Sequence, residues 1–231
     1  MNSPLESIAL FTVGPVPITA AVLVTWAIMA VLVLAGALLT RRLAVSPSST
    51  QAALELLVES VDGQIEQATG ADAAPYRSFI GTLFVFILVA NTSSLVPGIE
   101  PPTAQIETDA ALALLVFLSV IWFGVRAQGL GGYLKTFAAP NPIMIPLNIL
   151  EKLTRTFSML VRLFGNVMSG VFVIGVVVSL AGLLVPIPLM ALDLLTGIVQ
   201  AYIFAILAVV FIAAAVGGAP AAGPKTERTS L

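Results

Sequence analysis

The chain has 231 residues, of which 58% are hydrophobic and only 10% are charged, and its mean hydropathy is +1.06. Because soluble domains carry about 25% charged residues, this composition excludes an ordinary water-soluble protein. A net charge of -2 provides no basic surface for a phosphate backbone, so no nucleic-acid partner is expected. The sequence contains no histidine and no cysteine, which excludes imidazole or thiolate metal sites and catalysis by a histidine base or a cysteine nucleophile. We therefore expect a membrane protein with no metal and no cofactor of its own.

Five apolar stretches are long enough to cross a bilayer, whose hydrocarbon core requires roughly 20 helical residues. They cover residues 18–39, 79–95, 110–125, 147–184 and 189–216. The predicted fold class is an all-α polytopic membrane protein with five transmembrane helices. We expect a single membrane domain at 18–217, preceded by an external N-terminal segment at 1–17 and followed by a cytoplasmic tail at 218–231.

Residues 46–70, between the first two spans, have an amphipathic pattern. Leu57, Val61 and Ile65 share one helical face, whereas Glu59 and Asp62 fall on the opposite face. One apolar face and one acidic face predict a helix that lies along the membrane surface.

The basic residues predict the orientation of the chain. If the N-terminus lies outside, every loop that contains Lys or Arg faces the cytoplasm, as the positive-inside rule requires. Of the three segments on the opposite side, the one between the second and third spans carries Glu100, Glu107 and Asp109. These acids predict a solvated loop cluster by default. The alternative is the mouth of an ion entrance, for which Glu107 and Asp109 are the candidates.

The fourth and fifth stretches predict a long helical hairpin over residues 147–216. As one helix, the fourth stretch would be about 55 Å long, well beyond the thickness of the hydrocarbon core. It must therefore tilt strongly, kink or begin outside the core. We expect a long tilted hairpin, closed by a turn that contains Pro186 and Pro188.

Arg162 is the one basic residue deep inside a predicted span. Its guanidinium stays protonated, and placing it at mid-membrane costs at least about 2.5 kcal/mol, so such a residue usually marks a functional site. Asp193 is the acidic residue that lies deep in a predicted span, the fifth. If the hairpin folds symmetrically about Leu183, Asp193 lies opposite Phe172 or Val173. That position is roughly 16 Å along the hairpin from Arg162. We therefore expect Arg162 to meet a carboxylate from another molecule; the alternative is a structural salt bridge.

Each arm of the hairpin also carries a stripe of polar residues on one helical face. The stripes consist of Arg162, Asn166 and Ser169 in the fourth stretch and Asp193, Thr196 and Gln200 in the fifth. Two polar stripes in otherwise apolar helices predict a path for water or ions. The alternative is hydrogen bonding between helices, with small residues that allow a close approach.

The fourth stretch contains the motif Arg162-Leu163-Phe164-Gly165-Asn166, preceded by Leu150-Glu151-Lys152 and followed by Ser169-Gly170. Further segments of note are Leu95-Val96-Pro97-Gly98, Pro101-Pro102-Thr103-Ala104 and Gln200-Ala201-Tyr202-Ile203-Phe204. Together these motifs resemble subunit a of F-type ATP synthases. The resemblance covers nearly the whole chain and implies a protein of the bacterial inner membrane that contacts a c-ring and the b subunits of a peripheral stalk.

The resemblance also implies a role for the polar residues of the hairpin. Arg162 corresponds to the stator arginine that displaces the ion from each passing ring carboxylate, between two offset half-channels. Asn166 and Gln200 match positions near that arginine. Asp193 matches a position where many relatives have a titratable residue that works with a second one, but Val171 stands at the second position here. Protons are the expected coupling ion and sodium the alternative, while ATP chemistry would belong to other subunits, so the chain itself is expected to be non-catalytic.

Two other classes of function are compatible with a charged residue inside a span. A secondary transporter could use Arg162 to bind an anionic substrate, although the five unequal spans show no internal repeat. A membrane scaffold could use Arg162 in a structural role. Neither class requires a partner ring.

Overall fold

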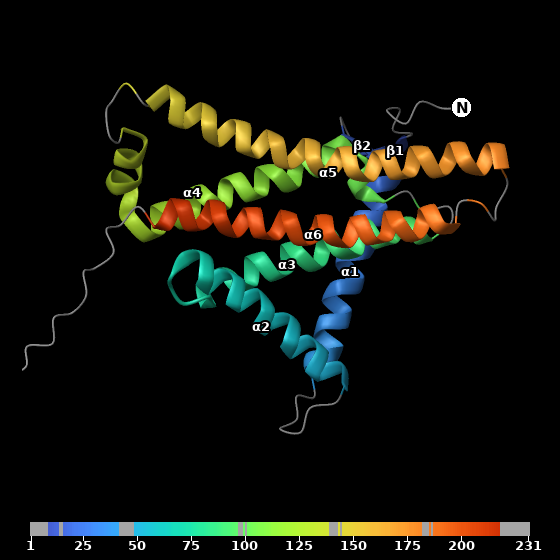
Figure 1. The fold of residues 1–231 in the computed structure, drawn as a ribbon, viewed down its shortest axis with the longest axis horizontal. Coiled ribbons are helices and arrows are strands. Elements are labelled where there is room, and N and C mark those ends of the chain that lie inside the picture. Colours follow the sequence, from blue (N-terminus) through green and yellow to red (C-terminus); the bar gives the residue numbers. More distant parts are fainter. Residues whose placement is uncertain are drawn as a thin grey trace, which may run out of the picture.

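The computed structural model describes residues 9–13, 16–41, 49–96, 99, 101–138, 143, 145–181, 185 and 187–217, and helices make up most of this part of the chain (Figure 1). The α-helices are α1 (Ala20–Thr40), α2 (Ser49–Thr69), α3 (Ala74–Thr92), α4 (Ile106–Ala138), α5 (Ile145–Ala181) and α6 (Ile187–Val216). Two short 3-10 helices, η1 (Ser93–Leu95) and η2 (Pro102–Ala104), lie between α3 and α4. Every described α-helix except α2 is long and apolar enough to cross a membrane, which confirms the predicted polytopic helical fold.

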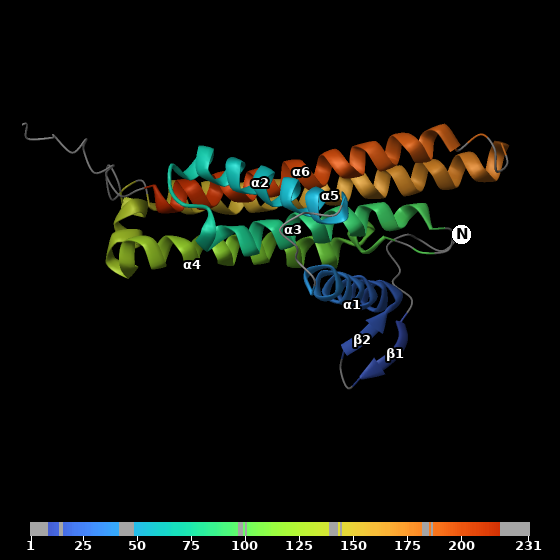
Figure 2. The same ribbon diagram turned by 90° about the horizontal axis from the view of Figure 1, so that it is seen from below.

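One element differs from the all-helical prediction. A β-hairpin precedes α1, in which β1 (Ala9–Val13) and β2 (Val16–Thr19) pair antiparallel. Figure 2 shows this hairpin next to α1 and apart from the long helices. The tail predicted at 218–231 and residues 46–48 of the predicted surface helix lie outside the described residues.

Helix α6 is the centre of the bundle, because it packs against α2, α3, α4 and α5. Its buried positions include Gly197, Ala201, Ala205 and Ala208. Such small side chains allow neighbouring helices to approach closely, which is the usual packing mode inside membranes.

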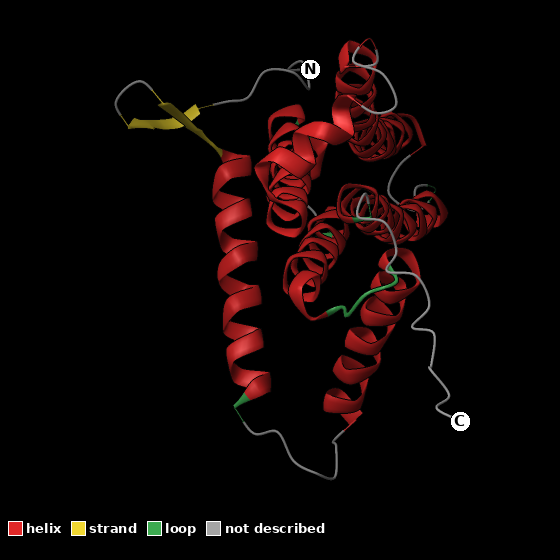
Figure 3. Cartoon of the chain, turned by 90° about the vertical axis from the view of Figure 1, so that its left-hand side faces the viewer, coloured by secondary structure: helices red, strands yellow, loops and turns green. Residues whose placement is uncertain are grey.

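Helices α5 and α6 form the predicted hairpin. At about 1.5 Å per residue, the 37 residues of α5 span about 55 Å and the 30 residues of α6 about 45 Å, both more than the roughly 30 Å of a hydrocarbon core. Figures 1 and 3 show that α1 runs steeply across α5 and α6. A single membrane normal cannot be parallel to both directions, which favours a strong tilt of the hairpin.

Helix α2 is the predicted amphipathic helix, and it packs against α3 and α6. Its apolar face is fully buried at Ile65, whereas Leu54 and Val58, earlier on the same face, remain exposed. Asp62 Oδ2 forms an ion pair with Arg77 Nη2 at 2.5 Å, which ties α2 to the first turns of α3. The end of α2 thus covers the bundle, while its beginning keeps an apolar face free for lipid or protein.

Helix α4 is broken at Gly129, where φ is 71° and ψ is 164°. Glycine is favoured at this backbone conformation because it has no Cβ. After the break Tyr133 packs back onto Gly124, where an added Cβ would lie 2.5 Å from Tyr133 Cε2. Asn148 Nδ2, in the first turn of α5, donates a hydrogen bond to the Phe137 carbonyl oxygen at 2.8 Å. This bond holds the last turns of α4 beside the first turns of α5.

Candidate functional site

A cavity of about 230 Å³ between α5 and α6 brings together four of the predicted site residues. Asn166 and Ser169 come from α5, and Asp193 and Thr196 come from α6. Ser169 Oγ donates to the Asn166 carbonyl oxygen at 2.9 Å, and Thr196 Oγ1 donates to the Asp193 carbonyl oxygen at 2.9 Å. The carboxyl group of Asp193 is the ionisable group of this lining.

The Asp193 carboxyl lies between Gly170 and Ser94. Ser94 Oγ donates a hydrogen bond to Asp193 Oδ2 at 3.3 Å. On the other side, an added Cβ at Gly170 would collide with Asp193 Oδ1. The prediction that Asp193 lies opposite Phe172 or Val173 is therefore slightly wrong, because counting along a hairpin assumes parallel helices and a symmetric turn. Gly170 is about 12 Å along α5 from Arg162, not the predicted 16 Å.

Arg162 lies one turn before Asn166, on the outward side of α5. Its side chain is exposed, and it makes no ion pair with any residue that the structure describes. The exposed face of α5 continues through Gly165, Ser169 and Val173. A permanent positive charge thus faces away from the bundle, on a helix apolar enough to cross a membrane. Such a charge is costly against lipid and calls for a partner that covers it.

A buried polar network lies next to this cavity and joins α3, η2 and α6. Asn91 Nδ2 donates to the Gly197 carbonyl oxygen at 2.8 Å, and Thr103 Oγ1 donates to Asn91 Oδ1 at 2.8 Å. This network fixes the end of α3, and with it Ser94, against α6. Ser94 was not predicted as a site residue, although the polar run that begins at Asn91 closes an otherwise apolar span.

The remaining candidates occupy different environments. Glu107 is exposed in the first turn of α4, but Asp109 is fully buried at 0% exposure, so the expectation of a solvated cluster is wrong for Asp109. Both Asp109 carboxyl oxygens and Gln200 Nε2 lack a hydrogen-bond partner among the described residues. Glu100 lies outside the described residues. Buried polar atoms without partners are rare and usually have a functional explanation or an ordered water.

The contact between Gly170 and Asp193 can be tested through stability. We expect Gly170→Ala to lower the free energy of unfolding by about 1–3 kcal/mol, because the added methyl group forces the Asp193 side chain out of its position. Gly175→Ala, on the same helix, has no atom within 4 Å of the added Cβ and should be neutral or slightly stabilising. Thermal unfolding followed by circular dichroism in detergent measures both variants. Equal melting temperatures would contradict the packing of Asp193 on Gly170.

Comparisons with known proteins agree with the resemblance. The sequence profile of the family described as ATP synthase A chain matches residues 22–213. ATP synthase subunit a 2 of Bradyrhizobium sp. is 61% identical over 216 residues, which are 94% of this chain and 97% of that protein. ATP synthase subunit a of Albidiferax ferrireducens is 45% identical over 93% of this chain and 92% of its own length, and ATP synthase subunit a 2 of Acaryochloris marina is 47% identical over 87% of each. The chain therefore belongs to the family of F-type ATP synthase subunit a, a subunit of the membrane sector.

Proposed function

We propose that the chain is the ion-translocating stator of an F-type ATP synthase, which passes ions between the two sides of the membrane and the carboxyl groups of a rotating c-ring. The observation that carries this proposal is the outward-facing guanidinium of Arg162, which has no carboxylate partner among the described residues. A carboxylate on each passing ring subunit would be its transient partner. The ATP chemistry would remain with other subunits, so the chain itself is non-catalytic.

The face around Arg162 supports contact with a helical partner. Large apolar side chains are exposed on this side of α5, among them Val161 and Phe172. Gly165, beside Arg162, has open space where its Cβ would be, so a partner helix can approach closely. A surface of this kind must be covered by lipid or by protein, and the charge of Arg162 favours protein.

The cavity that contains Asp193 is the proposed outer half-channel. Its polar side chains would pass ions along α6 toward Arg162, with Asn166 and Gln200 near the end of that route. Asp109 and Gln200 carry buried polar atoms that a chain of water molecules would satisfy, which supports a wet path between Glu107 at the surface and the interior. Because Val171 stands where many relatives have a second titratable residue, Asp193 would serve this route with help from Thr196 and water.

The basic loops support an orientation with the N-terminus outside and the C-terminus in the cytoplasm, in a bacterial inner membrane. In this orientation α2 lies at the cytoplasmic side, where its exposed apolar residues Leu54 and Val58 would contact lipid or the b subunits of the peripheral stalk. The proposed partners are thus the c-ring, the b subunits and the bilayer.

ATP-driven ion uptake into inverted membrane vesicles that contain the assembled complex tests this function. Proton transport predicts acidification of the vesicle interior that does not depend on sodium. Sodium transport predicts uptake of labelled sodium that a protonophore does not abolish. ATP hydrolysis by an assembled complex without uptake of either ion would contradict the proposal.

A further inference from the structure

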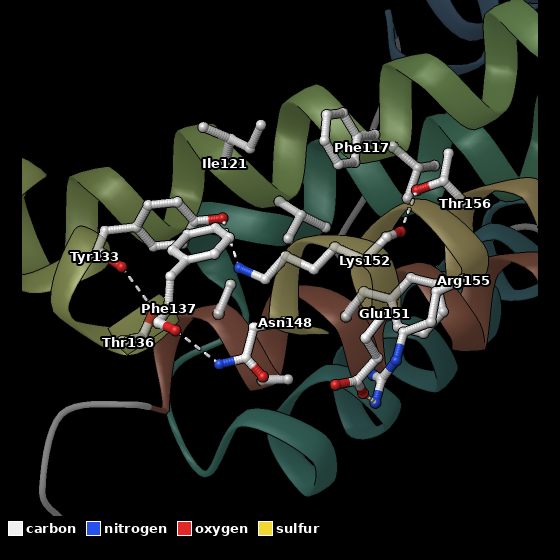
Figure 4. Close-up of a pocket in the computed structure, with 15 residues that line it drawn as sticks. Phe117, Ile121, Tyr133, Thr136, Phe137, Asn148, Glu151, Lys152, Arg155 and Thr156 are labelled. Atoms are coloured by element: carbon white, nitrogen blue, oxygen red, sulfur yellow. Dashed lines mark hydrogen bonds and ion pairs between the residues drawn. The ribbon is translucent and has the colours of Figure 1, made fainter. Parts of the chain in front are cut away.

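A second cavity, of about 220 Å³, lies where α4 ends and α5 begins (Figure 4). It is separate from the cavity around Asp193, because its α5 residues lie between Asn148 and Thr156, before Arg162 in the chain. Polar side chains from the last turns of α4 and the first turns of α5 line one part of it. Apolar residues of α4 and α6, such as Val116 and Phe211, line the rest.

Lys152 is the central charge of this cavity. Its Nζ atom donates a hydrogen bond to Tyr133 Oη at 3.0 Å and lies 3.8 Å from the centre of the Phe137 ring. No carboxylate among the described residues forms an ion pair with it. An ammonium group has three donors and one of them is used by Tyr133, so Lys152 keeps donors for a ligand.

The groups around Lys152 are held in place by the fold. Tyr133 is buried on Gly124, and Phe137 packs edge-on against Tyr133 with ring centres 5.3 Å apart. Asn148 links the beginning of α5 to the carbonyl oxygen of Phe137. The phenol of Tyr133 accepts the hydrogen bond from Lys152, so its own O–H can donate to a second acceptor. A rigid phenol and an ammonium group side by side form a donor pair suited to an anionic oxygen.

The remaining charges of the cavity leave a net positive charge. Glu151 and Arg155 form an ion pair with each other one turn apart on α5, and Arg155 also stacks on Phe211 with its guanidinium 5.4 Å from the ring centre. Figure 4 shows this pair on the side of Lys152 opposite to Phe117 and Ile121. Arg155 thus neutralises the Glu151 carboxylate, so the positive charge of Lys152 remains unbalanced.

The cavity also continues into a surface suited to hydrocarbon. Phe117 and Ile121 of α4 form its apolar wall, and Leu114 extends the same face of α4 with its side chain exposed. Helix α4 is one of the helices that can span a membrane, so this face would meet lipid chains. A positive donor pair above an apolar helical face is the arrangement expected for an anionic lipid headgroup.

We propose that this cavity binds the phosphodiester headgroup of an anionic phospholipid. Lys152 Nζ and Tyr133 Oη hold the phosphate oxygens, and the acyl chains lie along α4 beside Phe117 and Ile121. The site is distinct from the cavity of the proposed outer half-channel, because neither Arg162 nor Asp193 lines it. A bound lipid would contact α4 on both sides of the break at Gly129 and would also contact the first turns of α5.

The test uses the assembled complex in phosphatidylcholine vesicles that contain a small fraction of photoactivatable phosphatidylglycerol. Mass spectrometry after irradiation maps the labelled peptides. We expect labelling of α4 around Phe117 and Ile121 that is about fivefold stronger than with photoactivatable phosphatidylcholine, which is neutral. Lys152→Met removes the charge but keeps an unbranched apolar side chain, and it should lose this preference. Lys152→Arg should retain it, and Lys135→Met, at an exposed lysine outside the cavity, should leave it unchanged.

Three results would overturn the proposal. The first is equal labelling by the two lipids in the unmodified complex, a comparison that requires no variant. The second is an undiminished preference in Lys152→Met. The third is suppression of the labelling by inorganic phosphate in the millimolar range, which would identify free phosphate as the occupant of the cavity. Loss of assembly in Lys152→Met leaves the first and third comparisons decisive.

Discussion

Arg162→Ala should abolish ATP-driven ion uptake while the complex still assembles. The side chain of Arg162 is exposed and has no ion-pair partner among the described residues, so its loss leaves the packing of α5 intact. A pair of unit charges about 4 Å apart is worth about 4 kcal/mol at an effective dielectric constant of about 20. If this attraction is lost from the rate-limiting displacement of the ion from the ring carboxylate, the rate of that step falls by a factor of about a thousand. Uptake into inverted vesicles, normalised to the amount of assembled complex, measures the effect.

Two matched variants separate the role of Arg162 from general effects. Arg126→Ala removes the same side chain from an exposed position of α4, just before the break at Gly129. Ser158→Ala removes a polar group from the same face of α5, one turn before Arg162. Both should keep near-normal uptake. Undiminished uptake in Arg162→Ala would refute the stator role and would favour a scaffold. Lost uptake together with lost assembly would show that Arg162 is structural.

The features that followed from the sequence are those that depend on local patterns. A span needs only length and apolar composition, so all five spans were predicted, and α1, α5 and α6 begin and end within about three residues of the predicted limits. The isolated charge of Arg162 is likewise visible without a structure, because a guanidinium inside an apolar helix stands out from its neighbours. Helix α4 was predicted to end at Val125, because the polar and glycine residues that follow break the apolar pattern, yet the helical turns continue to Ala138 around the break at Gly129.

Features that depend on contacts between distant elements could not be predicted. The sequence places Asp109 among the acids of a predicted connecting segment, whereas in the structure it lies in the first turn of α4 and its burial depends on the packing of η2 against α4 and α5. Ser94 becomes a partner of Asp193 only because Asn91 fixes the end of α3 against Gly197. The contact of Asp193 with Gly170 likewise depends on the crossing of α5 and α6, which periodicity alone does not give. Sequence patterns thus identified the polar residues of the hairpin, while their partners required the fold.

Asp193→Asn should reduce ion uptake by about a hundredfold or more if protons are the coupling ion, because a positioned group that transfers protons typically contributes about 10²–10⁴ to a rate. The amide has nearly the same shape as the carboxyl and still accepts the hydrogen bond from Ser94, so the cavity should keep its form. The variant therefore tests the titratable group and leaves the packing on Gly170 unchanged. Uptake at saturating ATP, with assembly verified, is the measurement.

Glu59→Gln makes the same change at an exposed position of α2 and should leave uptake unchanged. Asp109→Asn makes the change at a fully buried carboxyl group, whose oxygens have no partner among the described residues. A loss confined to Asp193→Asn would place the single required carboxyl between α5 and α6. Losses in both Asp193→Asn and Asp109→Asn would extend the route to the first turn of α4 and would supply the second titratable group that Val171 does not provide. Near-normal uptake in Asp193→Asn would remove this carboxyl from the mechanism, and the polar lining of its cavity would then serve only the contact between the two helices.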